Sequence, residues 1–381
     1  MNWVTYLKDP FLVAIDTSIL NNIARDYFHE EKCKNSIAND FLDKLYNCSA
    51  IPVITWHHIE EMLAHKNDKI AAMSIAFIKE LPLLAIVKSD VEIFIGSILD
   101  IEANEIRHIL KTDASTIDTI IKNTKRDIYK FCSGSEIIEP LVPILGTLRQ
   151  KVLSKVNKNR EIASISRAKT LKTHYKYKLS DIKNMKNYTY SDEATHILLN
   201  QMKNDLNSEI KKKGDKKILF VDETTNNFIS NIQIKNNYSN KPMIDIIQES
   251  SGLTKEEFNK IKSWEDLECV PIFRSRLKTI ADKLKDGNRE EILKIQEKNC
   301  PIWLLWKELY KIRVNAERAS GSDINDNLLV GLCLYTDLTI VDKRTHEYLT
   351  QIKRKNNLIK KHIGSFEKLS NYVDLLSLLP K

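Results

Sequence analysis

The first hundred residues alternate short apolar runs with longer amphipathic stretches. The short runs have the length of strands, and the longer stretches repeat apolar side chains at helical spacing. The pattern predicts strands over residues 12–15, 51–54 and 83–87, separated by helices over 18–30, 36–47, 56–63 and 68–80. Strands that alternate with helices form parallel sheets with the helices packed on the faces. We therefore predict an α/β fold, in which Leu12 to Ile15 form a strand buried on both sides.

The pattern changes between about residue 90 and residue 300. Helical periodicity dominates there, and the run Lys217 to Glu223 is the one strand candidate. Its end, Asp222-Glu223, is typical of the metal strand of nucleotide hydrolases, but no G-x-x-x-x-G-K-[ST] loop is present to hold the phosphates. The sequence therefore excludes an ATPase of that class and predicts a mostly helical middle region.

The α/β pattern returns after residue 300. It predicts helices over 302–318, 323–332 and 345–353, a strand over 338–341, and a final amphipathic stretch over 372–379 that packs on the core. We expect residues 1–100 and 301–381 to form one domain with a parallel sheet flanked by helices. Residues 101–300 would be a helical, basic insertion that interrupts it.

Positive charge is concentrated in the middle of the chain. The net charge is +8, yet residues 151–217 alone carry 17 Lys or Arg and 7 Asp or Glu. Such a segment favours a polyanionic partner, most often nucleic acid. The interleaving of aromatic and basic residues also suits stacking on unpaired bases. A solvated, lysine-rich helix is the alternative. The candidate phosphate contacts are Lys169, Lys172, Lys176 and Lys178.

Other features bear on the compartment. No apolar run reaches the roughly 20 residues of a membrane span, and the N-terminal residues lack the basic start and apolar core of a signal peptide. The 6 cysteines are scattered without a C-x-x-C pair, which is typical of reduced thiols. We predict a soluble cytoplasmic protein without a membrane partner.

Acidic residues occur where the predicted fold would bring them together. Asp16 and Asp342 each end a predicted strand, Glu61 lies two turns into a helix, and Asp323 and Asp326 share one face of another. Clustered carboxylates repel each other unless a cation lies among them, and hard ions such as Mg²⁺ or Mn²⁺ prefer oxygen ligands. The chemistry that uses such a site is phosphoryl transfer to a metal-activated water.

The order of these residues resembles that of the PIN-domain nucleases. The matching motifs are Asp16-Thr17-Ser18, Thr55 through Glu61-Met62, Asp323-Ile324-Asn325-Asp326, and Thr339-Ile340-Val341-Asp342. The resemblance covers about residues 1–100 and 300–381. It implies a metal-dependent ribonuclease site built from Asp16, Glu61, Asp326 and Asp342, with Asp323 as an additional acid. The chain departs from the family pattern at Ile340, where the family often has Thr or Ser.

Several alternatives remain open at this stage. Glu60 competes with Glu61, because one helical step decides which of them faces the site. His58, Glu61 and His65 share a helix face, but the sequence is not H-E-x-x-H and offers no distant ligand cluster for zinc. A phosphatase of the haloacid-dehalogenase type needs a second acid where this chain has Ser18. A flap-type or single-strand DNA nuclease would share the acids, and a catalytically inactive nucleic-acid-binding scaffold is the non-enzyme alternative.

We therefore predict an Mg²⁺- or Mn²⁺-dependent endoribonuclease that hydrolyses RNA phosphodiesters. Lys343 and Arg344, directly after Asp342, are candidate phosphate contacts beside the acids. RNA is favoured over DNA as the partner, and the insertion offers a surface for a second copy of the chain or a regulatory protein. A toxin or an antiviral defence effector would fit this architecture.

Overall fold

A computed structural model describes most of the chain outside its middle region. The described residues are 10–29, 31–89, 94–111, 116–165, 197, 200–201, 203–208, 245, 248–249, 252–284, 288–314 and 329–380. Contact clustering divides the chain into two units, and each is described by itself. Unit 1 comprises Met1–Ser154, Lys278–Ile312 and Asn325–Lys381, and unit 2 comprises Lys155–Leu277 and Arg313–Ile324.

Unit 1 begins with strands and helices in alternation. The elements are β1 (Phe11–Ala14), α1 (Thr17–Tyr27), α2 (Lys32–Asn47), β2 (Ala50–Ile54), α3 (Trp56–Leu63), α4 (Asp68–Glu80) and β3 (Leu84–Val87). They are followed by α5 (Ile98–Lys111), α6 (Ile117–Asp127), β4 (Tyr129–Cys132), α7 (Gly134–Ile138), the 3₁₀ helix η2 (Glu139–Ile144) and the start of α8 (Leu145–Ile165). The first seven elements have the order and type that the apolar pattern predicts.

The chain returns to unit 1 near its C-terminal end. The elements there are the end of α15 (Trp264–Lys283), α16 (Arg289–Leu293), the 3₁₀ helix η3 (Glu297–Asn299), α17 (Pro301–Val314), the 3₁₀ helix η4 (Gly331–Leu334), β5 (Leu338–Ile340), α19 (Lys343–Lys355), α20 (Asn357–Lys360), β6 (Ser365–Glu367) and the 3₁₀ helix η5 (Tyr372–Leu378). As expected, the last stretch packs on the core, because the rings of Tyr372 and Phe41 lie 5.0 Å apart.

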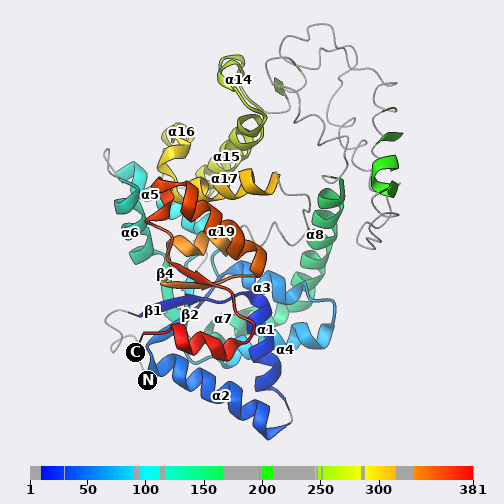
Figure 1. The fold of residues 1–381 in the computed structure, drawn as a ribbon, viewed down its shortest axis with the longest axis vertical. Helices are drawn as coiled ribbons and strands as arrows, with labels where there is room; N and C mark the ends of the chain where they lie inside the picture. Colours follow the sequence, from blue (N-terminus) through cyan, green and yellow to red (C-terminus); the bar gives the residue numbers. More distant parts are fainter. Residues whose placement is uncertain are drawn as a thin grey trace. The chain divides into compact units, whose positions relative to one another are not determined.

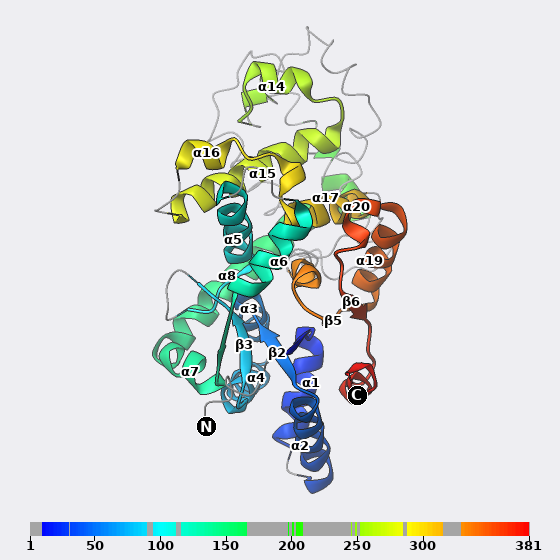
Figure 2. The same ribbon diagram turned by 90° about the vertical axis from the view of Figure 1, so that its left-hand side faces the viewer.

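The described strands form one six-stranded sheet in the order β4-β3-β2-β1-β5-β6, and Figure 2 shows this order from β3 to β6. All neighbouring strands are parallel except β3 and β4. The chain moves from β1 through β2 to β3 on one side, whereas β5 pairs with β1 on the other. The boundary between β1 and β5 is therefore the point where the strand order reverses.

Helices cover both faces of this sheet. Alternate strand residues on one face, such as Leu12, Val53 and Ala85, share a hydrophobic cluster with residues of α5, α17 and α19. The intervening residues must point to the opposite face, where α1 packs against α2, α3 and α4. Figure 1 shows α1, α2 and α4 on one side of the strands and α5, α17 and α19 on the other. The α/β fold with a mostly parallel sheet is thus confirmed.

The apolar pattern of the sequence does not predict β4 and β6. β4 (YKFC) and β6 (SFE) include charged residues and lack the continuous apolar runs of β1, β2 and β3. Because β4 belongs to the sheet and α5 crosses residue 100, unit 1 extends beyond the expected boundary there. The strand expected over Lys217–Glu223 lies outside the described residues.

The described part of unit 2 is helical. It contains the rest of α8, the helix α14 (Lys255–Lys260) and the greater part of α15. Leu253, Phe258, Ile261 and Leu267 form a small buried cluster with Val270 packed against it. None of the helices that the structure describes has the length and apolar character to cross a membrane. All six cysteines are free thiols.

A carboxylate fastens the start of β1 to the start of β5. Asp337 Oδ2 accepts a hydrogen bond from the Leu12 backbone N at 2.8 Å, and its Oδ1 accepts one from Lys125 Nζ at 2.6 Å. The Asp337 backbone N in turn donates to the Leu12 carbonyl at 2.9 Å. The two strands, more than 300 residues apart in the chain, are therefore held in register by a side chain as well as by the ladder.

Replacing this carboxylate should weaken the fold. We expect Asp337→Ala to lower the free energy of unfolding by about 1–3 kcal/mol, because a partly buried N–H and a lysine lose their acceptor. Asp337→Asn should cost less, since the amide oxygen can still accept from Leu12. The measurement is urea denaturation, with Asp43→Ala on the exposed face of α2 as the control. Equal midpoints for Asp337→Ala and the control would contradict this role.

Candidate functional site at the β1–β5 boundary

Asp16 links the end of β1 to the start of α1. Its backbone N donates to the Ile340 carbonyl at 3.1 Å and so continues the pairing of β1 with β5. Its side chain caps α1, since Oδ1 accepts from the Ser18 backbone N at 2.8 Å and from the Ser18 hydroxyl. Short polar side chains favour this cap position because they satisfy the free N–H groups of the first turn. The other oxygen, Oδ2, has no recorded hydrogen bond among the described residues.

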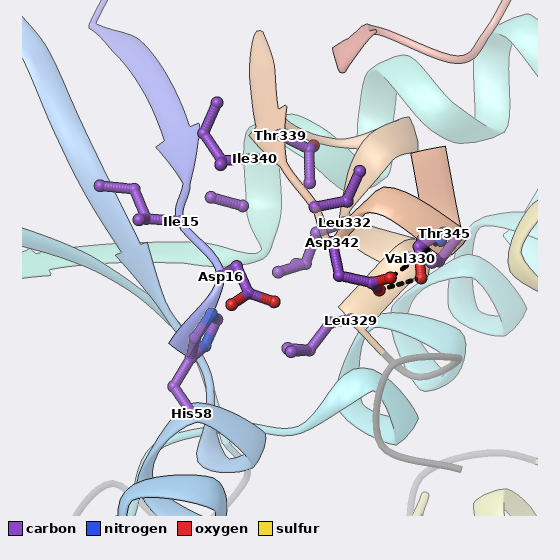
Figure 3. Close-up of a pocket in the computed structure, with 12 residues that line it drawn as sticks. Ile15, Asp16, His58, Leu329, Val330, Leu332, Thr339, Ile340, Asp342 and Thr345 are labelled. Atoms are coloured by element: carbon purple, nitrogen blue, oxygen red, sulfur yellow. Dashed lines mark hydrogen bonds between the residues drawn. The ribbon is translucent and has the colours of Figure 1, made fainter. Parts of the chain in front are cut away.

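Asp342 has the equivalent position after β5. It is the N-cap of α19, where Oδ1 accepts from the backbone N of Arg344 at 2.7 Å and of Thr345 at 3.2 Å. Its Oδ2 accepts from the Thr345 hydroxyl at 2.5 Å. In Figure 3 the Asp342 carboxylate is turned toward Thr345 on the right, while the Asp16 carboxylate lies across from it on the left. Both strand-end acids are therefore helix caps and pocket residues at once.

No Lys or Arg is found among the described residues that line the pocket between the two acids. It is lined by Ala14, Ile15, Asp16, His58, Leu329, Val330, Leu332, Thr339, Ile340, Val341, Asp342 and Thr345. Neither Asp16 nor Asp342 forms an ion pair within the described part of the chain. Burial raises the pKa of Asp16 above its usual value, the hydrogen bonds from Ser18 oppose this rise, and the negative charge of Asp342 adds to it. The site is thus an apolar pocket with negative charge that no described residue neutralises.

Glu61 lies on the Asp16 side of helix α3. Its Oε2 accepts a hydrogen bond from the hydroxyl of Thr17, the residue after Asp16. Burial raises the pKa of Glu61 to about 7, the Thr17 hydrogen bond opposes this rise, and the charges of Asp16 and Glu60 add to it. The Oε2 atom of Glu60 instead lies 3.3 Å from Nδ1 of His57. Of the two adjacent acids, Glu61 is therefore the one beside Asp16.

His58 holds the backbone around the site. Its Nδ1 accepts from the Thr55 backbone N at 3.0 Å, and its ring also bonds to the Ile15 backbone, directly before Asp16. Burial lowers the pKa of His58 to about 3, and the charge of His57 lowers it further. A neutral ring engaged with two backbone segments joins α3 to the end of β1. It is not arranged as a metal ligand, and His65 Nδ1 accepts from the Asn67 backbone N.

The donor set suits a hard divalent cation of the Mg²⁺ type. Among the described residues no group of three His, Cys, Asp or Glu side chains could hold a metal ion by itself. Magnesium, however, usually binds through one or two carboxylates and keeps several waters. Asp16 Oδ2 and the second lone pair of Asp342 Oδ2 can supply such contacts, and Glu61 Oε1 accepts no hydrogen bond among the described residues.

The remaining expected site residues divide into two groups. Lys343 and Arg344 form the first turn of α19 beside Asp342, with Lys343 exposed and Arg344 half-buried. Asp323, Asp326, Lys169, Lys172, Lys176 and Lys178 lie outside the described residues, and their roles stay predictions. Leu329, where the described chain resumes, lines the pocket three positions after Asp326.

Three hydroxyl groups that donate hydrogen bonds to the acids were not predicted from the sequence. Ser18, Thr345 and Thr17 donate to Asp16, Asp342 and Glu61 respectively. A signal was present, because a Ser or Thr two or three residues after a capping Asp is close enough to bond its carboxylate.

Neutralising Glu61 should change how stability depends on pH. Because the pKa of Glu61 is raised in the fold, ionisation opposes folding, and wild type loses stability as pH rises from about 4.5 through about 7. Relative to wild type, Glu61→Gln should therefore stabilise the metal-free protein by roughly 1–3 kcal/mol at about pH 8, and much less at about pH 5. The measurement is denaturant unfolding at both values in EDTA. Exposed Glu347→Gln is the control, and a pH-independent effect of Glu61→Gln would contradict the expectation.

Comparisons of this chain with known proteins add no assignment. No family model, no curated protein and no solved structure matches it. The description of the site above therefore comes from the geometry of this chain.

Proposed function

We propose that the chain is an Mg²⁺- or Mn²⁺-dependent nuclease of the PIN-domain type, which hydrolyses phosphodiesters at the pocket between β1 and β5. The observation that supports it most directly is the position of Asp16 and Asp342, on one pocket at the carboxyl ends of two adjacent parallel strands. Ligands of open α/β sheets bind at such a reversal of strand order. The order of Asp16, Glu61 and Asp342 along the chain is also that of the family the sequence resembles.

The proposed roles follow from the surroundings of each acid. Asp16 and Asp342 hold the cation, and Ser18 and Thr345 fix their orientation. A bound divalent ion would lower the pKa of a water and neutralise charge on the phosphate. Glu61, whose Oε2 is held by Thr17 beside Asp16, would accept a proton from that water. Asp326 and Asp323 are proposed as further acids of the site.

One observation favours an inactive nucleic-acid-binding scaffold instead. Both strand-end aspartates cap helices, which is sufficient structural reason for their presence, and the described residues contain no group of three metal ligands. A scaffold would bind nucleic acid equally well with and without a divalent ion and would cleave nothing. We further propose that the nuclease acts as a toxin or as a defence effector.

The proposal predicts metal-dependent cleavage that needs the strand-end acids. Labelled single-stranded RNA incubated with the full chain should be cut in Mg²⁺ or Mn²⁺ and left intact in EDTA. Asp16→Asn and Asp342→Asn should each slow cleavage by at least about a hundredfold. Asn caps helices about as well as Asp does, so these variants should remain folded. The measurement is the initial rate of cleavage on a denaturing gel.

Asp43→Asn, on the exposed face of α2, is the matched control and should cleave at the wild-type rate. Single-stranded and branched DNA form parallel arms, and faster cutting of DNA than of RNA would replace the ribonuclease assignment with a DNA nuclease. Cleavage in EDTA, or undiminished cleavage by Asp16→Asn, would remove the proposed mechanism.

A further inference from the structure

The second feature of unit 1 that points to a ligand is the basic surface of α19 and α20. Between Lys343 and Lys361 the chain has seven Lys or Arg and one acid, Glu347. The excess of six positive charges in 19 residues compares with a net charge of +8 for all 381. This segment is therefore strongly basic for its length, and it begins directly after Asp342.

The helix presents these charges on its outer side. Thr345, Tyr348, Leu349 and Ile352 are buried against the core and define the inner side of α19. Lys343 and Arg354 lie 11 residues apart, which is three helical turns, so they share the outer side about 16 Å apart. The cations of α19 thus lie at its two ends, Lys343 beside Asp342 and Arg354 three turns away on the same side.

Four of these cations have no acidic partner among the described residues. Lys343, Arg354, Lys355 and Lys360 are exposed, and no ion pair of theirs is recorded in the part of the chain that the structure describes. In contrast, Lys361 pairs with Asp118 at 2.8 Å, and Lys353 lies 5.1 Å from the centroid of the Phe366 ring. We call Lys343, Arg354, Lys355 and Lys360 the basic track.

Helix stability does not account for the whole track. Cations in the last turn of a helix favour its dipole, which would explain Arg354 and Lys355. Lys343 is in the first turn, where the dipole disfavours a cation, and the first turn of α19 contains no acid. A positive charge at that position, next to the pocket, points to a ligand with negative charge.

The surroundings favour nucleic acid over a membrane. Helices that lie on membranes expose an apolar face, but the apolar residues of α19 are buried, and none of the exposed large hydrophobic residues recorded in the described chain lies between residues 329 and 363. Exposed cations at both ends of α19, without exposed apolar neighbours, suit the repeated phosphates of a nucleic-acid strand better than a lipid surface.

We propose that the basic track binds the sugar–phosphate backbone of a nucleic acid and leads it along α19 to the pocket with Asp16 and Asp342. The position of the bound nucleic acid at this pocket rests on the proposed nuclease function. The binding itself does not, and it can be measured without cleavage.

The test uses the full chain with Asp16→Asn, in EDTA, with labelled single-stranded RNA and DNA followed by fluorescence anisotropy across a salt series. Replacing all four track residues with Gln should weaken binding at least about tenfold and reduce the slope of log K against log salt by about 2–3, at about 0.7 per lost phosphate contact. Glu347→Lys, which adds a cation between Lys343 and Arg354, should strengthen binding severalfold. A gain of this kind cannot arise from damage to the fold.

Lys44→Gln and Lys69→Gln, on the exposed faces of α2 and α4, are the matched controls and should leave affinity and slope unchanged. Thermal unfolding verifies that the fourfold variant is folded. Unchanged binding by that variant, or no gain with Glu347→Lys, would overturn the proposal, whereas similar losses on RNA and DNA would support backbone recognition. If binding follows these expectations but wild type cleaves nothing in Mn²⁺, only the proposed catalytic function fails.

Discussion

The parallel pairing of β1 with β5 is the constraint on which the rest of unit 1 depends. It joins the two ends of the chain at the point where the strand order reverses, and it brings Asp16 and Asp342 to one pocket. Asp16 loses hydration in this place, and no described cation compensates, so its negative charge costs free energy that the hydrogen bonds from Ser18 only partly offset. A divalent ion is the simplest group that would remove this cost.

The pocket and the basic track are complementary in charge and continuous in the chain. Asp342 follows β5 and is the N-cap of α19. The next residue, Lys343, is the first residue of the basic track. With a cation bound between its acids, such a pocket beside the basic track could bind one phosphate while the track binds neighbouring phosphates. The same arrangement would let an inactive scaffold bind nucleic acid, so catalysis and binding need separate tests.

Much of this could be predicted from the sequence, because the strong signals are local. The strands around Val13 and Val53 are fully apolar, and the helices between them keep their period, so their types and order were predictable. The strand-end acids could be found because each follows a buried run directly. The choice of Glu61 over Glu60 could not be made from the pattern, since it depends on where Thr17 lies after folding.

Other features depend on tertiary contacts that no local pattern encodes. β4 pairs antiparallel with β3 because the chain turns back after α6, and its Lys130 and Phe131 give no clear alternation. Asp337 precedes β5 and accepts a hydrogen bond from the Leu12 backbone N, but in the sequence it cannot be distinguished from an ordinary turn residue. The engagement of His58 with two backbone segments likewise appears only when α3 is packed against β1.

The most direct test of the account is whether the strand-end acids share a cation. Titration of the metal-free full chain with Mn²⁺, followed by electron paramagnetic resonance of the free ion, measures this without any nucleic acid. The account predicts saturable binding to wild type and to Asp43→Asn, and its loss in the Asp16→Asn and Asp342→Asn double variant. Equal Mn²⁺ binding by the double variant, or no binding by wild type, would contradict it.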